Sequence, residues 1–164
     1  MAQLFQGRYA AQIEGDFAVF LIGMRINQLW AMHKWMPVAV AMPKMLRELQ
    51  SKPDLGLLHV HSYVMGRTIM GVQYWRSMEQ LLAYAKNRDS AHLPAWRAFN
   101  KSVGTSGDVG IWHETYRVRA GDYESIYVNM PRFGLGKVGE LLDVAPGRRD
   151  GARDRLAEAT ASGG

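Results

Sequence analysis

A hairpin followed at once by a helix, within residues 57–87, limits the folds open to this chain more than any other stretch. Two runs rich in β-branched and aromatic residues, Leu57–Met65 and Thr68–Trp75, are separated only by Gly66 and Arg67. A Gly-X pair in that place favours a type II′ turn, because glycine accepts a positive φ. The two runs therefore predict an antiparallel β-hairpin.

The residues directly after the hairpin have the pattern of a helix N-terminus. Ser77 and Gln80 predict a capping box, in which the Ser77 hydroxyl accepts a hydrogen bond from the Gln80 backbone N–H and the Gln80 side chain reaches back. Apolar residues then recur at helical spacing over 78–87. A hairpin that leads into a helix is the centre of a β-α-β-β-α-β plan.

The flanking segments complete this plan. Phe17–Ile26 is almost continuously apolar, which is typical of a strand covered on both faces. A helical pattern follows over 29–50, and Pro37 and Pro43 are expected to kink or break it. Residues 91–103 predict a second helical piece, and Val109–Val118 predicts a fourth strand. The sequence thus predicts an α+β fold with a ferredoxin-like β-α-β-β-α-β antiparallel sheet.

Length and composition fit one domain of this kind. The 164 residues suffice for one core. We expect an N-terminal arm at 1–16, the α+β domain at 17–145, and a disordered tail at 146–164, where Gly, Arg, Asp, Ala and Ser dominate. Since the strand Phe17–Ile26 needs cover on both faces, a second copy packed sheet on sheet would supply it, and we expect a homodimer.

Charge and cysteine content argue against several classes of protein. The chain has no cysteine, which excludes disulfides and thiolate metal ligands. The net charge is +5, but no basic stripe with interleaved aromatics is present, so we expect no nucleic-acid partner. The apolar-rich stretch Leu29–Met42 is too short to span a bilayer, and the N-terminus lacks the apolar run of a signal peptide. We therefore expect no membrane association and a cytoplasmic location.

Three of the histidines pose the question of a metal site. His59 and His61 stand two apart on a predicted strand and therefore face the same side. With His113 they would make a three-histidine site, but there is no helical histidine pair, and the neighbouring Glu114 points to the opposite face from His113. Histidines hydrogen-bonded in a core or interface are the favoured interpretation, and we expect no metal.

His92 stands at the start of a predicted helical piece, one turn before Trp96, so the two side chains share a face. If that face looks into the space between helices and sheet, His92 can bind a substrate oxygen, act as a general acid or base, or ligate haem iron. A surface histidine at a helix end is the competing interpretation.

Aromatic pairs on two strands would line the same space. Tyr74 and Trp75 alternate faces, as do Trp112 and His113, so each strand sends one such group inward whichever parity holds. An aromatic lining suits flat organic ligands. The same pattern also builds an ordinary α+β core, and both interpretations stay open.

Several segments together resemble one known family. They are VQYWRSMEQLLAYAK, SAHLPAWRAFN, IWHETYRV and YESIYVNMPRFGLG. The chain, over roughly Phe17 to Leu142, resembles the monooxygenase-like domain family of fungal terpenoid–polyketide pathways and bacterial proteins of unknown function. That family is related to the antibiotic-biosynthesis monooxygenases, in the dimeric α+β barrel superfamily. The resemblance implies a ferredoxin-like dimer with a ligand cleft between sheet and helices in each subunit.

The resemblance also implies a function in secondary metabolism. Relatives include cofactor-free oxygenases of electron-rich phenols, haem-degrading enzymes and haem-dependent dehydratases. We therefore expect a small-molecule oxygenase that needs no cofactor and acts on an aromatic or polyketide/terpenoid-type substrate. His92 would be catalytic, and the substrate-binding residues would be Trp35, Tyr74, Trp75, Trp96 and His113. The alternatives are a haem-binding protein or haem-dependent enzyme with His92 on the iron, and a non-catalytic ligand-binding dimer. In haem degraders the iron ligand falls nearest to Trp96 here, which argues against haem.

Overall fold

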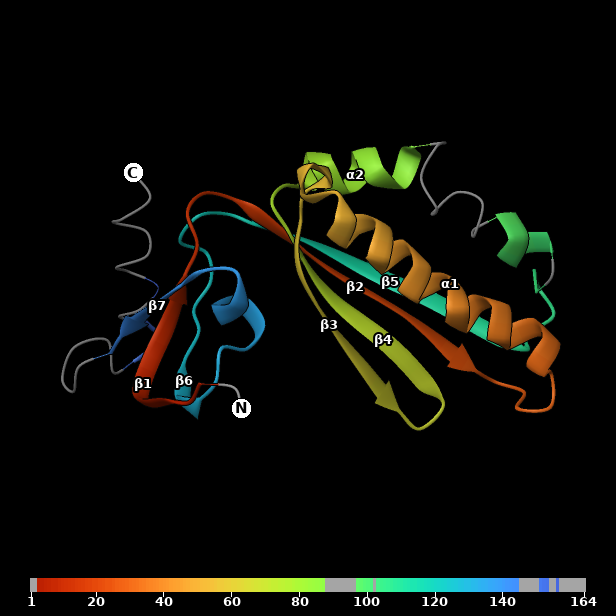
Figure 1. Ribbon diagram of the computed structural model, residues 1–164, viewed down its shortest axis with the longest axis horizontal. Coiled ribbons are helices and arrows are strands. Elements are labelled where there is room, and N and C mark those ends of the chain that lie inside the picture. The colour runs from red at the N-terminus through yellow and green to blue at the C-terminus, as the bar shows by residue number, and fades with distance from the viewer. Residues whose placement is uncertain (1–2, 88–96, 102, 145–150, 154–155, 157–164) are drawn as a thin grey trace. The chain divides into compact units, whose positions relative to one another are not determined.

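The computed structural model describes residues 3–87, 97–101, 103–144, 151–153 and 156 (Figure 1). The chain divides into two compact units. The central unit is Ala18–Tyr116, and the terminal unit combines Met1–Phe17 with Arg117–Gly164. No helix in the described part of the chain is long and apolar enough to cross a membrane.

The central unit follows the predicted β-α-β-β-α-β plan. Its elements are β2 (Phe17–Ile26), α1 (Met32–Ser51), β3 (Leu57–Met65), β4 (Thr68–Trp75), α2 (Met78–Lys86) and β5 (Val109–Val118), with a short 3-10 turn η1 (Pro53–Leu55) before β3. The strand order is β3-β4-β2-β5, and β4 runs antiparallel to both β3 and β2. This is the ferredoxin-like order, so the predicted fold class is confirmed.

The central hairpin and the helix start form as the sequence predicts, with one difference. Gly66 has φ of +57°, and Met65 pairs with Thr68 across the turn. The Ser77 hydroxyl accepts from the Gln80 backbone N–H at 3.1 Å. The return half of the capping box does not form, because the Gln80 side-chain amide donates instead to the Asp54 carbonyl at 3.2 Å. The helix start is thereby tied to η1.

The first helix continues through both prolines, so of the two expected outcomes, a kink or a break, the break does not occur. Pro37 and Pro43 lie inside α1, where each removes a backbone donor at a cost of about 3 kcal/mol. The helix is held by its apolar stripe, which packs onto the sheet from Val38 near one end to Leu49 near the other. Burial along this stripe offsets the local cost of the prolines.

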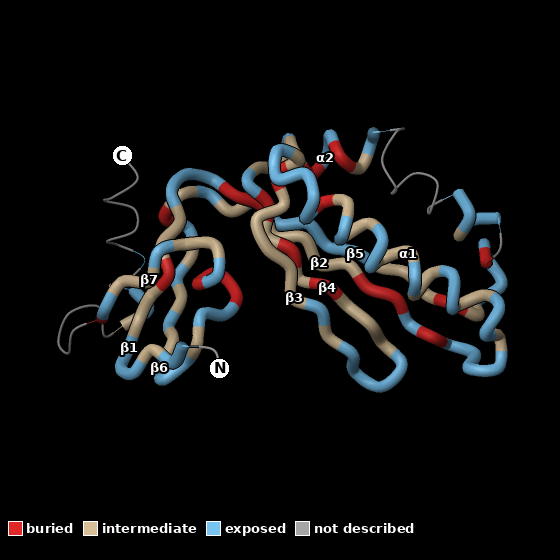
Figure 2. The backbone as a smooth tube through the Cα atoms, in the orientation of Figure 1, coloured by how far each residue is buried: buried red, intermediate tan, exposed pale blue. Residues whose placement is uncertain are grey.

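The apolar core of the central unit consists of two separate clusters between the sheet and the helices (Figure 2). The first cluster contains Ala18, Leu49, Trp75, Leu81 and Tyr84. The second contains Met24, Ile26, Val103 and Val109. Residues 97–101 are helical, and Phe99 packs against the second cluster. The middle of the sheet therefore lies between these two packed clusters.

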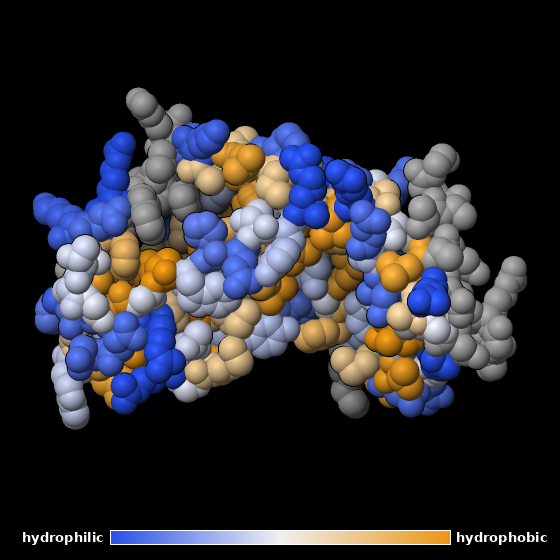
Figure 3. All heavy atoms as spheres, turned by 180° about the vertical axis from the view of Figure 1, so that it is seen from behind, coloured by the Kyte–Doolittle hydropathy of each residue, from blue (hydrophilic) through white to orange (hydrophobic). Residues whose placement is uncertain are grey.

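The alternation of strand residues gives the sheet a helix face and a far face. The helix face, on which both clusters lie, includes Ala18, Phe20, Ile22, Met24, Gly71, Gln73, Trp75 and His113. The far face includes Val19, Leu21, Gly23, His59, His61, Val72, Tyr74 and Trp112. In the view from behind, apolar side chains reach the surface of both units (Figure 3).

The terminal unit has a small antiparallel sheet of its own. It contains β1 (Phe5–Gln12), β6 (Tyr127–Met130), β7 (Glu140–Asp143) and a 3-10 turn η2 (Gly134–Lys137), with strand order β6-β1-β7. The segment that the sequence predicts to be an N-terminal arm is therefore the middle strand of a sheet. Within β1 only Ala11 is buried, so the strand lacks the apolar alternation that would have indicated it. The predicted tail at 146–164 lies almost wholly outside the described residues.

Candidate functional site

The candidate site is a row of side chains that crosses the middle of the helix face. Gln73 on β4 pairs with Val60 on β3 and with Phe20 on β2. The Phe20 ring in turn contacts the His113 imidazole on β5, with 5.6 Å between ring centroids. Residues paired across neighbouring strands face the same side, so these four side chains lie side by side.

Gln73 is the one buried polar residue in the described part of the chain, with 4% of its surface exposed. Its Oε1 accepts a hydrogen bond from Trp75 Nε1 at 2.9 Å. Because an indole N–H can only donate, the amide oxygen must face Trp75, and the N–H₂ group points away from it. This N–H₂ group makes no hydrogen bond to any residue that the structure describes.

Gly71, two residues before Gln73 on β4, is buried and adds no side chain to the helix face. A Cβ built at Gly71 would come no closer than 3.7 Å to Val60 and 3.9 Å to Ile22. Phe20, Ile22 and Val60 are only half-buried, in contrast to the residues of the two clusters. The middle of the sheet thus combines half-buried apolar side chains with a hydrogen-bond donor carried by a buried residue.

His113 supplies the second polar group of the row. It is exposed, and Phe20 separates it from Gln73. Two strand spacings place the backbones of Gln73 and His113 roughly 10 Å apart. An aromatic ring seated over Phe20 would therefore have a neutral amide donor on one side and an imidazole on the other.

A hydrogen-bonded pair of polar side chains, one from α1 and one from α2, borders the first cluster. The Tyr84 hydroxyl on α2 donates to Glu48 Oε2 on α1 at 3.3 Å. Burial raises the pKa of Tyr84 above its ordinary 10.0, and the negative charge of Glu48 and the hydrogen bond to it raise it further. Lys52 Nζ lies 3.4 Å from the other Glu48 oxygen. Tyr84 thus stays neutral and acts as a buried donor to a paired carboxylate.

The structure brings some of the predicted site residues together and separates others. Trp35 is half-buried against the second cluster, and its Nε1 donates to the Leu29 carbonyl at 3.0 Å. Trp75 is 1% exposed and belongs to the first cluster. These two residues and His113 share the helix side of the sheet, whereas Tyr74 lies on the far face. His92 and Trp96 lie outside the described residues.

The structure separates the three histidines that were considered as metal ligands. His59 and His61 lie on the far face with ring centroids 4.5 Å apart, whereas His113 lies on the helix face. No group of three or more His, Asp or Glu that could hold a metal ion occurs among the residues described. A three-histidine centre is therefore not formed in this fold.

Sequence reasoning did not single out Gln73. The available signal was one amide side chain in the middle of the otherwise apolar run from Ile69 to Trp75. A polar residue in a strand covered by helices needs a partner or a function. The alternation of side chains along a strand could not show that Gln73 faces the helices, because the hairpin register does not say which face of the sheet the helices cover.

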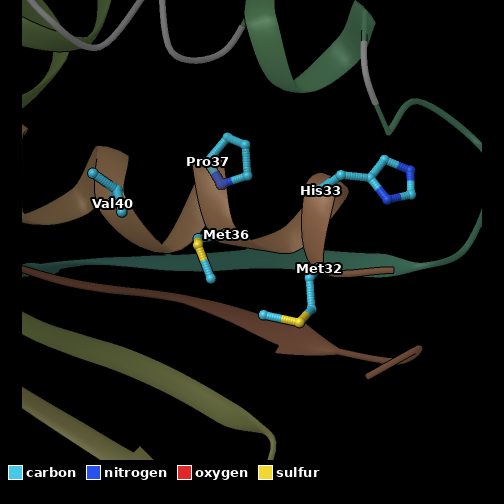
Figure 4. A pocket seen from close by; sticks show the side chains of 5 residues that line it. All are labelled: Met32, His33, Met36, Pro37 and Val40. Carbon is cyan, nitrogen blue, oxygen red and sulfur yellow. The ribbon is translucent and has the colours of Figure 1, made fainter. Parts of the chain in front are cut away.

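An open apolar hollow of about 430 Å³ lies on the first half of α1. It is lined by Met32, His33, Met36, Pro37 and Val40 (Figure 4). Met32 and Met36 point to one side of the helix, and the His33 ring projects away from them. A haem pocket encloses both faces of the macrocycle, whereas these residues of one helix offer a single wall. This hollow therefore does not fit a haem group.

The fold defines a ferredoxin-like α+β domain, and comparison with known proteins gives its family. Residues 17–135 match the model of the Monooxygenase af470-like family, so the chain belongs to this family. This confirms the resemblance inferred from the sequence. Monooxygenase af470 of Aspergillus fumigatus is 29% identical over 183 residues, a match that covers 94% of this chain and 61% of that protein. The chain thus spans about three fifths of its relative's length.

Solved structures with the same fold include two aldoxime dehydratases. One, in complex with butyraldoxime, has a TM-score of 0.67 at 13% identity and covers 87% of this chain and 44% of that one. The other has a TM-score of 0.62 at 16% identity and covers 84% and 44%. At this identity the likeness concerns the fold, and in both cases this chain matches less than half of the longer protein.

Proposed function

We propose that the chain is a small-molecule monooxygenase that acts on an aromatic substrate of polyketide or terpenoid type and needs no cofactor. The observation that carries the proposal is that the family match, residues 17–135, contains the whole helix face with its row of Gln73, Phe20 and His113. A partly packed aromatic face with a few polar groups suits a flat organic ligand.

The proposed reaction needs an ionisable hydroxyl on the substrate. A base removes the proton from a phenol or enol, and the resulting carbanion transfers one electron to O₂. The substrate radical and superoxide then combine to a peroxide, which takes up a proton. Loss of water leaves one oxygen atom as a new carbonyl and releases the other as H₂O, so one O₂ is consumed for each substrate. The protein supplies a base, donors to the anion, and an apolar wall that excludes water.

In this proposal the resemblance assigns the base to His92 and the wall beside it to Trp96. Trp35 borders the second cluster and His113 borders the row, so both can contact a substrate on the helix face. Trp75 is part of the scaffold and holds the Gln73 amide. Tyr74 lies on the far face and contacts substrate only if a second copy places it at a shared site.

Oxygen uptake by the purified chain tests the function. We expect O₂ consumption with hydroxylated polycyclic aromatics that stays unchanged after treatment with a chelator, and an absorption spectrum without a Soret band near 400 nm. A Soret band in the protein as purified would replace this proposal with the haem alternative. Absence of uptake over a broad panel of phenols and enols would favour a non-catalytic binding module.

Two variants separate the site from the scaffold. His92→Ala should abolish oxygen uptake while leaving the melting temperature nearly unchanged, because the sequence predicts this histidine at the start of a helical piece, where it would contribute little to a core. Trp96→Ala should lower both, since the sequence predicts Trp96 in the pocket wall and truncation of a tryptophan packed in this way costs about 3–5 kcal/mol. Full activity in His92→Ala would remove this residue from the mechanism.

We also propose that the far face is the interface of a homodimer. Val19, Leu21 and Val72 lie on this face and are half-buried. The Trp112 indole lies over Gly23, where an added Cβ would sit 2.7 Å from Nε1, so the glycine lets the ring lie flat on the sheet. A second sheet packed on this surface would bury these apolar residues, which the helices on the opposite side of the sheet cannot cover.

A further inference from the structure

We propose that the side-chain amide of Gln73 binds the oxyanion of the substrate, and that the site therefore selects phenolates and enolates over aromatics without a hydroxyl. This inference rests on the proposed function, because it names the substrate class of the same site. The aromatic ring would lie over Phe20, and the negatively charged oxygen would accept from the amide N–H₂ of Gln73.

The first argument is the unused hydrogen-bonding capacity of a buried group. Gln73 is 4% exposed, and its amide N–H₂ makes no hydrogen bond to the residues described. The nitrogen is not among the fully enclosed atoms that lack a partner, so solvent reaches this donor in the free protein. A ligand oxygen that accepts from this group would replace the solvent there and use a donor that no described residue occupies.

The second argument is that the amide is fixed before any ligand arrives. The Trp75 indole N–H holds the Gln73 oxygen at 2.9 Å, and Trp75 itself is 1% exposed in the first cluster. The amide therefore cannot flip without losing this bond, and its two N–H donors keep one direction. A donor oriented in advance loses little conformational entropy when an anion binds.

The third argument is the surroundings of the amide. Gly71, two residues earlier on β4, adds no side chain to the helix face, and the neighbouring Phe20, half-buried beside the first cluster, offers an aromatic surface. Glutamine has no charge at any pH, so it stabilises an anion by a charge-assisted hydrogen bond and needs no protonation of its own. An aromatic ligand without an oxygen would leave the amide unsatisfied and would bind more weakly.

Binding of 4-nitrophenol tests the inference, with nitrobenzene as the ligand that lacks the hydroxyl. Titrations are made without oxygen, at a pH where the free phenol is mostly ionised, so turnover is not needed. The wild-type chain should bind 4-nitrophenolate roughly 10- to 100-fold more tightly than nitrobenzene. The absorption of the bound phenol should also show a pKa lower than that of the free phenol.

Two substitutions remove the donor in different ways. Gln73→Glu keeps an oxygen for the Trp75 indole but has no N–H₂, and Gln73→Met keeps the length without either group. Both should lose most of the preference for the phenolate and leave nitrobenzene binding within about twofold. Gln80→Met is the matched control, since the same exchange at the start of α2 lies away from the row and should preserve the preference.

A wild-type measurement covers the case in which both Gln73 variants fail to fold. Addition of 4-nitrophenol should shift the side-chain amide signals of Gln73 in a ¹H–¹⁵N spectrum much further than saturating nitrobenzene, whose ring alone perturbs them. Equal affinity of the wild type for the two ligands, an undiminished preference in folded Gln73→Met, or unshifted amide signals would each overturn the inference. A clear preference without oxygen uptake on any substrate would support it while contradicting the proposed function.

Discussion

The two faces of the central sheet come from the same strands but differ in how their middles are packed. On the helix face, two closed clusters flank a middle row that contains a buried amide and an exposed imidazole. On the far face, Val19, Leu21 and Val72 are half-buried, and none of them belongs to either cluster. One backbone layer therefore separates a candidate ligand site from a candidate interface.

This difference makes the position of a residue along its strand informative about its role. Neighbouring residues such as Tyr74 and Trp75 point to opposite faces, so substitutions one position apart should affect different properties. Changes on the helix face should alter stability or ligand binding, and changes on the far face should alter association. Substitutions on the two faces and at the start of α2 test this separation.

Trp75→Ala should destabilise the fold by about 3–5 kcal/mol, because it removes the largest fully buried side chain among the described residues. Tyr74→Ala, one position earlier on the far face, should cost much less in a dilute, dissociated sample. Chemical denaturation monitored by circular dichroism measures both. Equal losses in the two variants would show that the faces do not differ in packing.

Val72→Lys should weaken self-association by roughly 2 kcal/mol or more, because it places a charge in the middle of the proposed interface. The wild-type chain should elute as a dimer in size-exclusion chromatography with light scattering, and the variant as a monomer of about 18.5 kDa. Arg25→Lys, at the end of the same face, is a charge-preserving control. A monomeric wild type at micromolar concentration would contradict the interface.

Ser77→Ala should cost about 1 kcal/mol, because it removes the side-chain acceptor for the Gln80 backbone N–H at the start of α2. Thermal denaturation measures the loss. Ser77→Asp should restore most of it, since aspartate is also a good helix N-cap. If Ser77→Ala melts at the wild-type temperature, the cap is not needed to begin this helix.

Tyr84→Phe should cost about 1 kcal/mol at neutral pH, because the hydrogen bond to Glu48 is lost. The folded state raises the pKa of Tyr84, so its contribution is complete below pH 10.0 and declines as the pH rises further, where only the unfolded chain ionises this residue. The stability difference between wild type and variant should therefore shrink between pH 10 and pH 11. A difference that widens there would contradict the proposed environment of Tyr84.

The sequence predicted those parts of the fold that depend on local chemistry. The turn at Gly66 needs a positive φ, and the cap at Ser77 needs a hydroxyl three residues before a backbone N–H, so both are readable in short stretches. The strand order follows once the hairpin, the helices and the strand Phe17–Ile26 are known, because few β-α-β-β-α-β arrangements avoid crossed connections.

The parts that could not be predicted depend on contacts between distant residues. The continuity of α1 through Pro37 is set by its packing on the sheet, which local propensity does not include. Gln73 becomes notable only when its bond to Trp75 and its burial beneath the helices are known. Of the predicted site residues, His113 and Trp35 lie on the helix side of the sheet, while the roles of His92 and Trp96 stay predictions.

The direct connection from β4 to α2 has a consequence for how this family can vary in length. β4 ends at Trp75, and Ser77, two residues later, already caps α2. Gln73 lies on the same strand. Insertion or deletion of one residue between Gly66 and Gln73 would reverse which face each later residue of β4 occupies, or move the cap out of place. Homologues should therefore keep the spacing from the hairpin turn to the helix cap constant, and changes in length should occur elsewhere, such as the connection between α2 and β5.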